Sequence, residues 1–171
     1  VEGELIMPSP VDWWHQRIVG FLTCLLRMFC AARRLGEVGN GPALIRVARE
    51  RGREPDIFVL PPEQAAKARG RVLEVCPSLI IEVISPSTRS IDLHDKADEY
   101  AALGVLEYWI VDAERQTLHV LRLRSGAYER QTVGSGRVDS SAIPGFWIRA
   151  EWLWQDPVPP EPACLREIEA Q

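Results

Sequence analysis

The 171-residue chain lacks several features that define other classes of protein. No apolar run reaches the roughly 18–20 residues that a transmembrane helix needs. The first residues lack the basic and then apolar pattern of a signal peptide. Four cysteines occur, but no two have the C-x-x-C spacing of a zinc or redox motif. We therefore expect a cytoplasmic protein with reduced thiols and without zinc.

The chain also lacks a positive net charge, which is −4 at pH 7. An acidic protein is poorly suited to sequence-independent binding of nucleic acid, because that binding depends on neutralising phosphates. Four closely spaced arginines are candidates for a local basic patch, namely Arg46, Arg49, Arg51 and Arg53. These arginines fit either a nucleic-acid contact or a solvated loop face.

What the chain does contain is an ordinary globular composition, with 46% hydrophobic and 26% charged residues. Its length favours one domain with a single core. We expect that domain to span residues 1–156. Residues 157–171 are rich in proline and are expected to form a loosely held tail.

The chain is organised around residues 79–112. Residues 79–84 and 106–111 are apolar runs typical of strands buried on both faces, and residues 91–103 have helical spacing before Gly104, a helix-ending residue. Strand, helix and strand with short connections predict a parallel crossover unit. Glu82 is the exception in the first run, because a buried carboxylate must be paired, protonated or bound to a metal.

Further elements flank this unit. Residues 13–35 predict an amphipathic helix, residues 43–47 and 55–60 predict strands, and residues 117–123 and 127–133 predict a β-hairpin. The fold class expected from this order is α/β (α+β). It has a mixed central β-sheet flanked by helices, with the hairpin as a C-terminal extension.

Two acids on neighbouring strands form a candidate metal site. Asp56 begins one predicted strand and Glu82 lies inside another, while Asp92, Lys96 and Tyr100 share a helix face through their spacing of four. Strand-borne carboxylates that meet at one point suit Mg²⁺ or Mn²⁺, and a nearby lysine can orient water or a phosphate. A purely structural network of Asp56, Glu82 and Lys96 would have the same sequence pattern.

These residues resemble the Uma-type family of bacterial restriction-endonuclease-like proteins, within the PD-(D/E)XK nuclease superfamily. The resemblance covers about residues 2–125. It is carried by Pro55-Asp56, by Glu82-Val83-Ile84-Ser85-Pro86-Ser87-Thr88, by Asp92, Lys96 and Tyr100, by Gly104 and Glu107–Asp112, and by the N-terminal Glu2–Met7 and His15. It implies a restriction-endonuclease-like core with the catalytic strands at its centre.

The resemblance also implies the roles of the site residues. Asp56 and Glu82 would be metal ligands, together with the backbone carbonyl of Val83, and Lys96 would be catalytic. Glu2, His15, Asp92 and Tyr100 would support them. One departure stands out, since the superfamily places a lysine two residues after the second acid and Ile84 occupies that position here. Lys96 is therefore the expected substitute.

The implied activity is that of a Mg²⁺-dependent (or Mn²⁺-dependent) endonuclease that hydrolyses phosphodiester bonds in DNA by means of a metal-activated water. Cutting both strands of a duplex needs two active sites, so we expect a homodimer that acts on double-stranded DNA. The alternative is a catalytically weak or inactive nuclease-fold module that binds nucleic acid or a protein partner. An unrelated structural protein is a third interpretation of the same pattern.

Overall fold

The computed structural model describes residues 13–84 and 94–170. At its centre is a six-stranded mixed sheet in the order β1-β4-β6-β7-β8-β9. The bounds of these strands are Glu37–Asn40, Ile57–Leu60, Leu79–Val83, Glu107–Asp112, Thr117–Arg124 and Ala127–Val133. β6 and β7 are parallel, whereas the other neighbours are antiparallel. The predicted mixed α/β class and the parallel crossover unit are confirmed.

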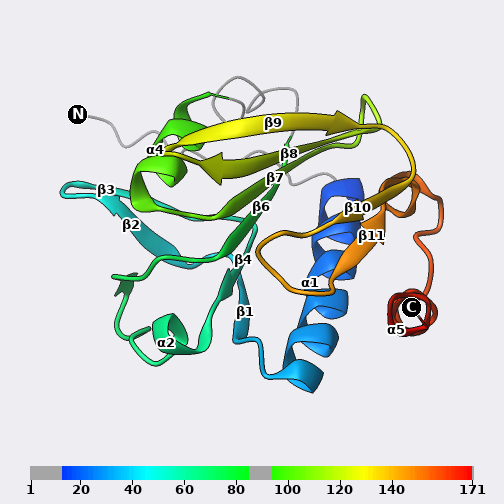
Figure 1. Ribbon diagram of the computed structural model, residues 1–171, viewed down its shortest axis with the longest axis horizontal. Coiled ribbons are helices and arrows are strands. Elements are labelled where there is room, and N and C mark those ends of the chain that lie inside the picture. The colour runs from blue at the N-terminus through cyan, green and yellow to red at the C-terminus, as the bar shows by residue number, and fades with distance from the viewer. Residues whose placement is uncertain (1–12, 85–93, 171) are drawn as a thin grey trace, which may run out of the picture.

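Helix α1 (Trp13–Arg33) covers one face of this sheet, and helix α4 (Asp95–Leu103) covers the other (Figure 1). α1 buries the residues that recur along it at three- and four-residue steps, from Ile18 to Phe29. They pack against alternate sheet residues, among which Leu79, Ile81 and Val83 are contributed by β6. Because side chains alternate along a strand, Ile80 and Glu82 must point to the α4 side.

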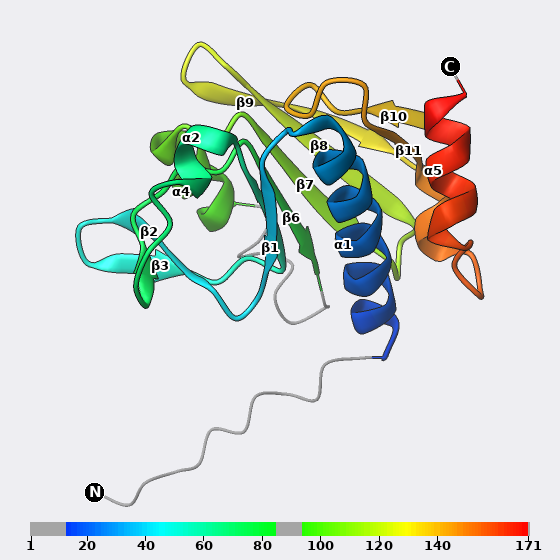
Figure 2. The same cartoon turned by 90° about the horizontal axis from the view of Figure 1, so that it is seen from below.

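The α4 side has its own apolar cluster, built around Tyr100, Tyr108 and Ile110. A smaller sheet, in the order β3-β2-β5, extends from it. Its strands are β2 (Leu44–Ala48), β3 (Arg51–Arg53) and β5 (Val72–Leu73), and the short helix α2 (Pro62–Ala65) follows β4. Figure 2 shows α4 and the β2–β3 hairpin together on the side of the main sheet away from α1.

The predicted hairpin at 117–133 is confirmed as β8 and β9, which complete the main sheet. The chain then forms the antiparallel pair β10 (Arg137–Asp139) and β11 (Trp147–Arg149), followed by the 3₁₀ helix η1 (Ala150–Trp154). The predicted helix at 91–103 is described from Asp95 onward. It ends at Gly104, whose φ of 93° favours glycine.

Residues 161–169 do not form the expected loose tail. They form helix α5 (Glu161–Glu169). The high proline content misled the prediction, since Pro162 lies in the first turn, where a proline costs no hydrogen bond. Cys164 and Ile168 have a spacing of four, are buried and join the core beside α1. Arg33 of α1 also forms an ion pair with Glu169 at 3.2 Å.

No helix among the described residues is both long enough and apolar enough to cross a membrane. The strand expected within Glu4–Met7 lies outside the described part of the chain.

Candidate active site

Asp56 lies where the pairing of β4 with β6 ends. The register pairs Ile57 with Ile81, so continuing it would place Asp56 opposite Glu82. The Asp56 carboxylate instead accepts a hydrogen bond at Oδ2 from the backbone N–H of Val83, at 2.8 Å. The side chain therefore takes over the position of a strand partner, and this contact fixes one carboxylate oxygen beside β6.

His15 reaches the same carboxylate from the first turn of α1. Its Nε2 atom lies 3.1 Å from Asp56 Oδ2, and the two side chains are 23% and 24% exposed. The family resemblance implied only a supporting role for His15. The structure adds a polar contact between the helix and the strand, which restricts how the Asp56 carboxylate can turn.

Glu82 points to the face of the sheet that α4 covers, and residues of α4 are its partners. The Lys96 Nζ atom lies 2.9 Å from Glu82 Oε1, and the Tyr100 hydroxyl donates a hydrogen bond to the same oxygen at 3.0 Å. The side chain of Glu82 is only 5% exposed and that of Lys96 is 17% exposed. A carboxylate at this depth needs such partners, because burying it alone would be very costly.

Tyr100 is held in place by its ring as well as by its hydroxyl. The ring is fully buried and contacts the Tyr108 ring edge-on, with the centroids 5.0 Å apart. Aromatic pairs favour this geometry. Tyr100 therefore anchors the middle of α4 to β7, and Lys96 lies one turn earlier on the same helix face.

Ile84 lies two residues after Glu82, where the PD-(D/E)XK superfamily has its lysine. The side chain is 7% exposed and belongs to the same apolar cluster as Ala97 and Tyr100 of α4. A lysine there would have to bury its charge beneath the helix. The structure instead brings the ammonium of Lys96 to Glu82, and the catalytic role of Lys96 remains a prediction.

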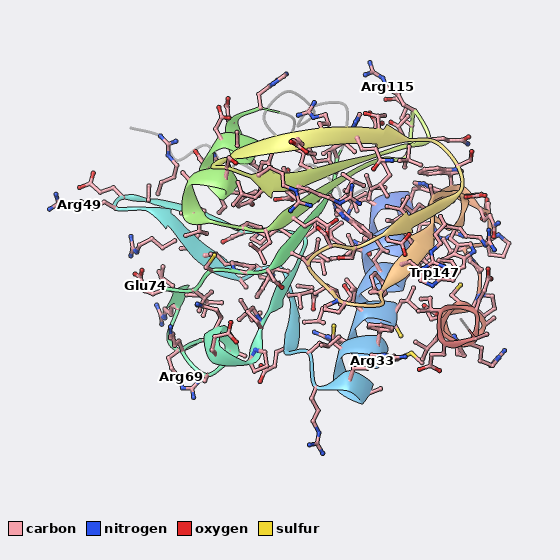
Figure 3. All side chains as sticks on the ribbon, in the orientation of Figure 1. Arg33, Arg49, Arg69, Glu74, Arg115 and Trp147 are labelled. Atoms are coloured by element: carbon pink, nitrogen blue, oxygen red, sulfur yellow. The ribbon has the colours of Figure 1, made fainter. Side chains whose placement is uncertain are left out.

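The four arginines of the candidate basic patch do not form a free cationic surface. Arg46 pairs with Glu74 at 2.5 Å, and both Arg51 and Arg53 pair with Glu99 of α4. Arg49 is exposed and extends away from the body of the protein at the tip of the β2–β3 hairpin (Figure 3).

Glu99 was not among the residues singled out from the sequence, yet it forms ion pairs with both Arg51 and Arg53 on the helix that carries Lys96. Its pKa is held below the ordinary value, mainly by the hydrogen bond from Arg53 and also by Arg51, against the effect of burial. The same bond raises the pKa of Arg53. Arg53 and Glu99 are 46 positions apart, so no local spacing could have indicated the pair.

Two residues expected to support the site, Glu2 and Asp92, lie outside the described part of the chain. Within residues 13–84 and 94–170, no group of three or more His, Cys, Asp and Glu side chains is arranged to hold a metal. A metal at this site would therefore depend on the two carboxylates and on backbone oxygen. The Val83 carbonyl is suitably directed, because the N–H and C=O of one strand residue point the same way and the N–H faces Asp56.

Comparisons with known proteins agree with the fold described above. The fold resembles the crystal structure of a putative nuclease of the DUF820 family from Anabaena variabilis, with a TM-score of 0.74 and 16% identity, over 90% of this chain and 87% of that one. At that identity the likeness concerns the fold alone. No curated protein matched the chain. The model of the Uma2 family, described as a putative restriction endonuclease, matches residues 1–151, and the chain therefore belongs to the Uma2 family.

Proposed function

We propose that this protein is a Mg²⁺- or Mn²⁺-dependent endonuclease that hydrolyses phosphodiester bonds in DNA. The observation that carries the proposal is that two acids are held at the same end of β6, Asp56 by the backbone N–H of Val83 and Glu82 by Lys96 of α4. The description of the family as a putative restriction endonuclease supports the same activity.

The donor set fits a hard divalent cation. Asp56 offers Oδ1, which accepts no hydrogen bond from any described residue, and Glu82 and the Val83 carbonyl add further oxygen atoms. Mg²⁺ and Mn²⁺ prefer such oxygen ligands and commonly keep several waters. When bound there, a divalent cation would activate water and offset the negative charge that develops on the phosphate.

The remaining residues have roles that follow from their contacts. Val83 and His15 both hold Oδ2 of Asp56, so that the other oxygen keeps a defined direction. Lys96 offsets the charge of Glu82 before substrate arrives, and its ammonium lies where it could turn towards a phosphate oxygen or the attacking water. Tyr100 keeps Glu82 oriented whichever contact Lys96 makes.

Two observations favour a second function, a nuclease fold that binds DNA or a protein without cutting DNA. Lys96, Tyr100 and Glu82 already satisfy one another at hydrogen-bonding distances, as a structural network would. Ile84 also occupies the position of the usual catalytic lysine. In this alternative the three residues stabilise α4 on the sheet, and catalysis is weak or lost.

A cleavage assay separates the two functions. Wild type and the variants Asp56→Asn, Glu82→Gln and Lys96→Met are incubated with supercoiled plasmid in Mg²⁺ or Mn²⁺. Asp98→Asn is the control, because Asp98 is exposed on the same helix. We expect wild type and the control to nick or linearise the plasmid, both acid variants to be inactive, and Lys96→Met to be about a hundredfold slower or worse.

Two results would contradict parts of this proposal, the first the role of Lys96 and the second the cleavage of DNA. Cleavage by Lys96→Met at the wild-type rate would remove the lysine from the mechanism. A wild type that shifts DNA in a gel but cleaves none of it would favour the binding module. Calorimetry with Mn²⁺ tests the metal separately, since equal affinity of wild type and Glu82→Ala would exclude Glu82 as a ligand.

A further inference from the structure

Glu99 joins α4 to the β2–β3 hairpin through both of its carboxylate oxygens. Arg53 donates from Nε to Oε2 at 2.6 Å and from Nη2 to Oε1 at 3.0 Å. Arg51 donates from Nη1 to Oε1 at 2.5 Å. The Glu99 side chain is 13% exposed, and that of Arg53 is 26% exposed. A two-pronged arginine contact restricts direction as well as distance, which distinguishes it from a flexible surface ion pair.

The same helix carries Lys96, three residues before Glu99. Residues three and four apart lie on neighbouring parts of a helix surface, so Lys96 and Tyr100 point to Glu82 while Glu99 points beside them to β3. α4 has only nine residues, and a helix of that length is marginal without tertiary contacts. Its position therefore depends on the contacts that hold it.

The contacts that hold α4 differ in whether they fix its rotation about its own axis. Ala97 and Tyr100 pack into the apolar cluster, and burial of this kind is not directional. The Tyr100 hydroxyl fixes one point near the middle of the helix. The guanidinium groups of Arg51 and Arg53 add a second polar anchor one residue away on another face, and two anchors on different faces oppose rotation of the helix about its axis.

We propose that Glu99 is a positioning residue: clamped by Arg51 and Arg53, it sets the rotation of α4 and so keeps the Lys96 ammonium at Glu82. This inference rests on the proposed function, because the position of Lys96 matters for activity only if the site cleaves DNA. The partners of Glu99 are Arg51 and Arg53 of β3, so its effect on the site would pass through the helix.

The kinetic test compares Glu99→Ala and Arg53→Met with the control Asp98→Ala. We expect both clamp variants to lower kcat by about 10–100-fold, because an ångström-scale displacement of a reacting group has effects of that size. KM and Mn²⁺ affinity should change less than about twofold, since the metal ligands lie on the strands. Circular dichroism identifies any variant that fails to fold, and the second clamp variant then replaces it.

A double variant distinguishes positioning from a general loss of stability. If Glu99 acts through Lys96, Lys96→Met combined with Glu99→Ala should be no slower than Lys96→Met alone. Independent, multiplying losses would overturn the proposal.

A spectroscopic readout makes the test independent of cleavage. The chain has two lysines, Lys67 and Lys96, and Lys67 is exposed. In protein labelled with ¹³C at the lysine Cε, wild type should give one signal from a held side chain and one from a mobile side chain, which Lys67→Arg assigns. In Glu99→Ala the Lys96 signal should move towards that of Lys67, whereas in Asp98→Ala it should not.

The outcomes separate the two proposals. A Lys96 signal that stays unchanged in Glu99→Ala overturns the positioning role, whatever the protein cleaves. A signal that moves in a protein that cleaves no DNA supports the clamp and refutes the proposed nuclease.

Discussion

Lys96 Nζ lies 2.9 Å from Glu82 Oε1, although the two residues come from different layers of the fold. β6 brings the carboxylate to the α4 side of the sheet, and the second residue of α4 brings the ammonium. The ion pair is largely buried, so both charges depend on each other and on the Tyr100 hydroxyl. Removing one charge must therefore affect stability as well as any chemistry.

In the absence of metal, we expect Lys96→Met to lower the free energy of unfolding by about 1–3 kcal/mol. The substitution leaves the buried Glu82 carboxylate without its positive partner, and breaking a buried pair from one side is destabilising. Saturating Mn²⁺ should narrow the difference from wild type, because a bound cation would supply the missing charge. Urea unfolding in EDTA and in Mn²⁺ measures both values. A gap of the same size in both conditions would argue against a metal beside Glu82.

A second stability prediction concerns Glu107, the first residue of β7, which is not part of the candidate site. Its carboxylate is fully buried, and Oε2 accepts hydrogen bonds from the Ser140 hydroxyl at 2.6 Å and from the backbone N–H groups of Ser141 and Ala142 at 2.9 and 3.0 Å. We expect Glu107→Ala to cost about 2–4 kcal/mol of folding free energy, because it leaves buried donors unsatisfied.

Urea unfolding checks the cost, with Glu129→Ala as the control, since Glu129 is exposed on β9. That control should change stability by no more than about 0.5 kcal/mol. Similar stabilities of the two variants would mean that Glu107 does not hold the loop at 140–142 to the sheet.

The clamp on Glu99 makes a prediction about acid. The hydrogen bond from Arg53 lowers the pKa of Glu99 in the folded state below its unfolded value, which is about 4.3. A depressed carboxyl pKa contributes stability that is fully present above the unfolded value and is lost as the pH falls through the folded value. The stability difference between wild type and Glu99→Gln should thus be constant from pH 7 to about 5 and shrink below about 4.3. Unfolding curves from pH 7 to pH 3 measure it, and a difference independent of pH would contradict the shifted pKa.

The central part of this site could be predicted from the sequence because local patterns encode it. Apolar runs at 79–84 and 106–111 marked the two strands, and Gly104 marked the end of the helix between them. Lys96 and Tyr100 share a helix face by their spacing, so a contact with the preceding strand was foreseeable. The crossover unit therefore needed no long-range information.

The contacts that cross between layers were not predictable in the same way. His15 and Asp56 lie 41 positions apart, and their contact depends on how α1 packs across the sheet. The clamp of Glu99 and the buried partners of Glu107 also join distant segments. From the sequence alone, a charged residue that is paired in this way cannot be distinguished from one that is exposed to solvent. α5 was missed for a different reason, because Pro160 and Pro162 suggested a loose tail although they flank the start of a helix.

We expect a homodimer, and two exposed surfaces could form it. β9 is an edge strand of the main sheet, and antiparallel pairing with a second copy could place Glu129 opposite Arg130 of the other chain. The outer face of α1, which carries the exposed Cys24, is the other surface. Light scattering at micromolar concentration should give about twice the 19.3 kDa mass of the chain.

The variants Glu129→Arg and Cys24→Arg then locate the interface. Glu129→Arg should dissociate a dimer formed through β9, because arginines would face each other, and should leave a dimer formed through α1 intact. Cys24→Arg should have the reverse effect. A wild type of monomer mass would refute the dimer itself.

The last prediction concerns how an acidic protein could hold DNA. The pairing of Arg46, Arg51 and Arg53 with glutamates leaves Arg49, exposed at the tip of the β2–β3 hairpin, as the arginine of this group best able to reach a phosphate. In an inactive Glu82→Gln background, Arg49→Ala should weaken binding to different DNA sequences to a similar extent. It should also reduce the slope of log K against log salt by about 0.9, the value for one lost phosphate contact. Titration of a labelled duplex at several salt concentrations measures this slope, with Arg69→Ala as the control, because Arg69 is also exposed but lies after α2. Equal slopes for wild type and Arg49→Ala would show that the hairpin tip does not touch the DNA backbone.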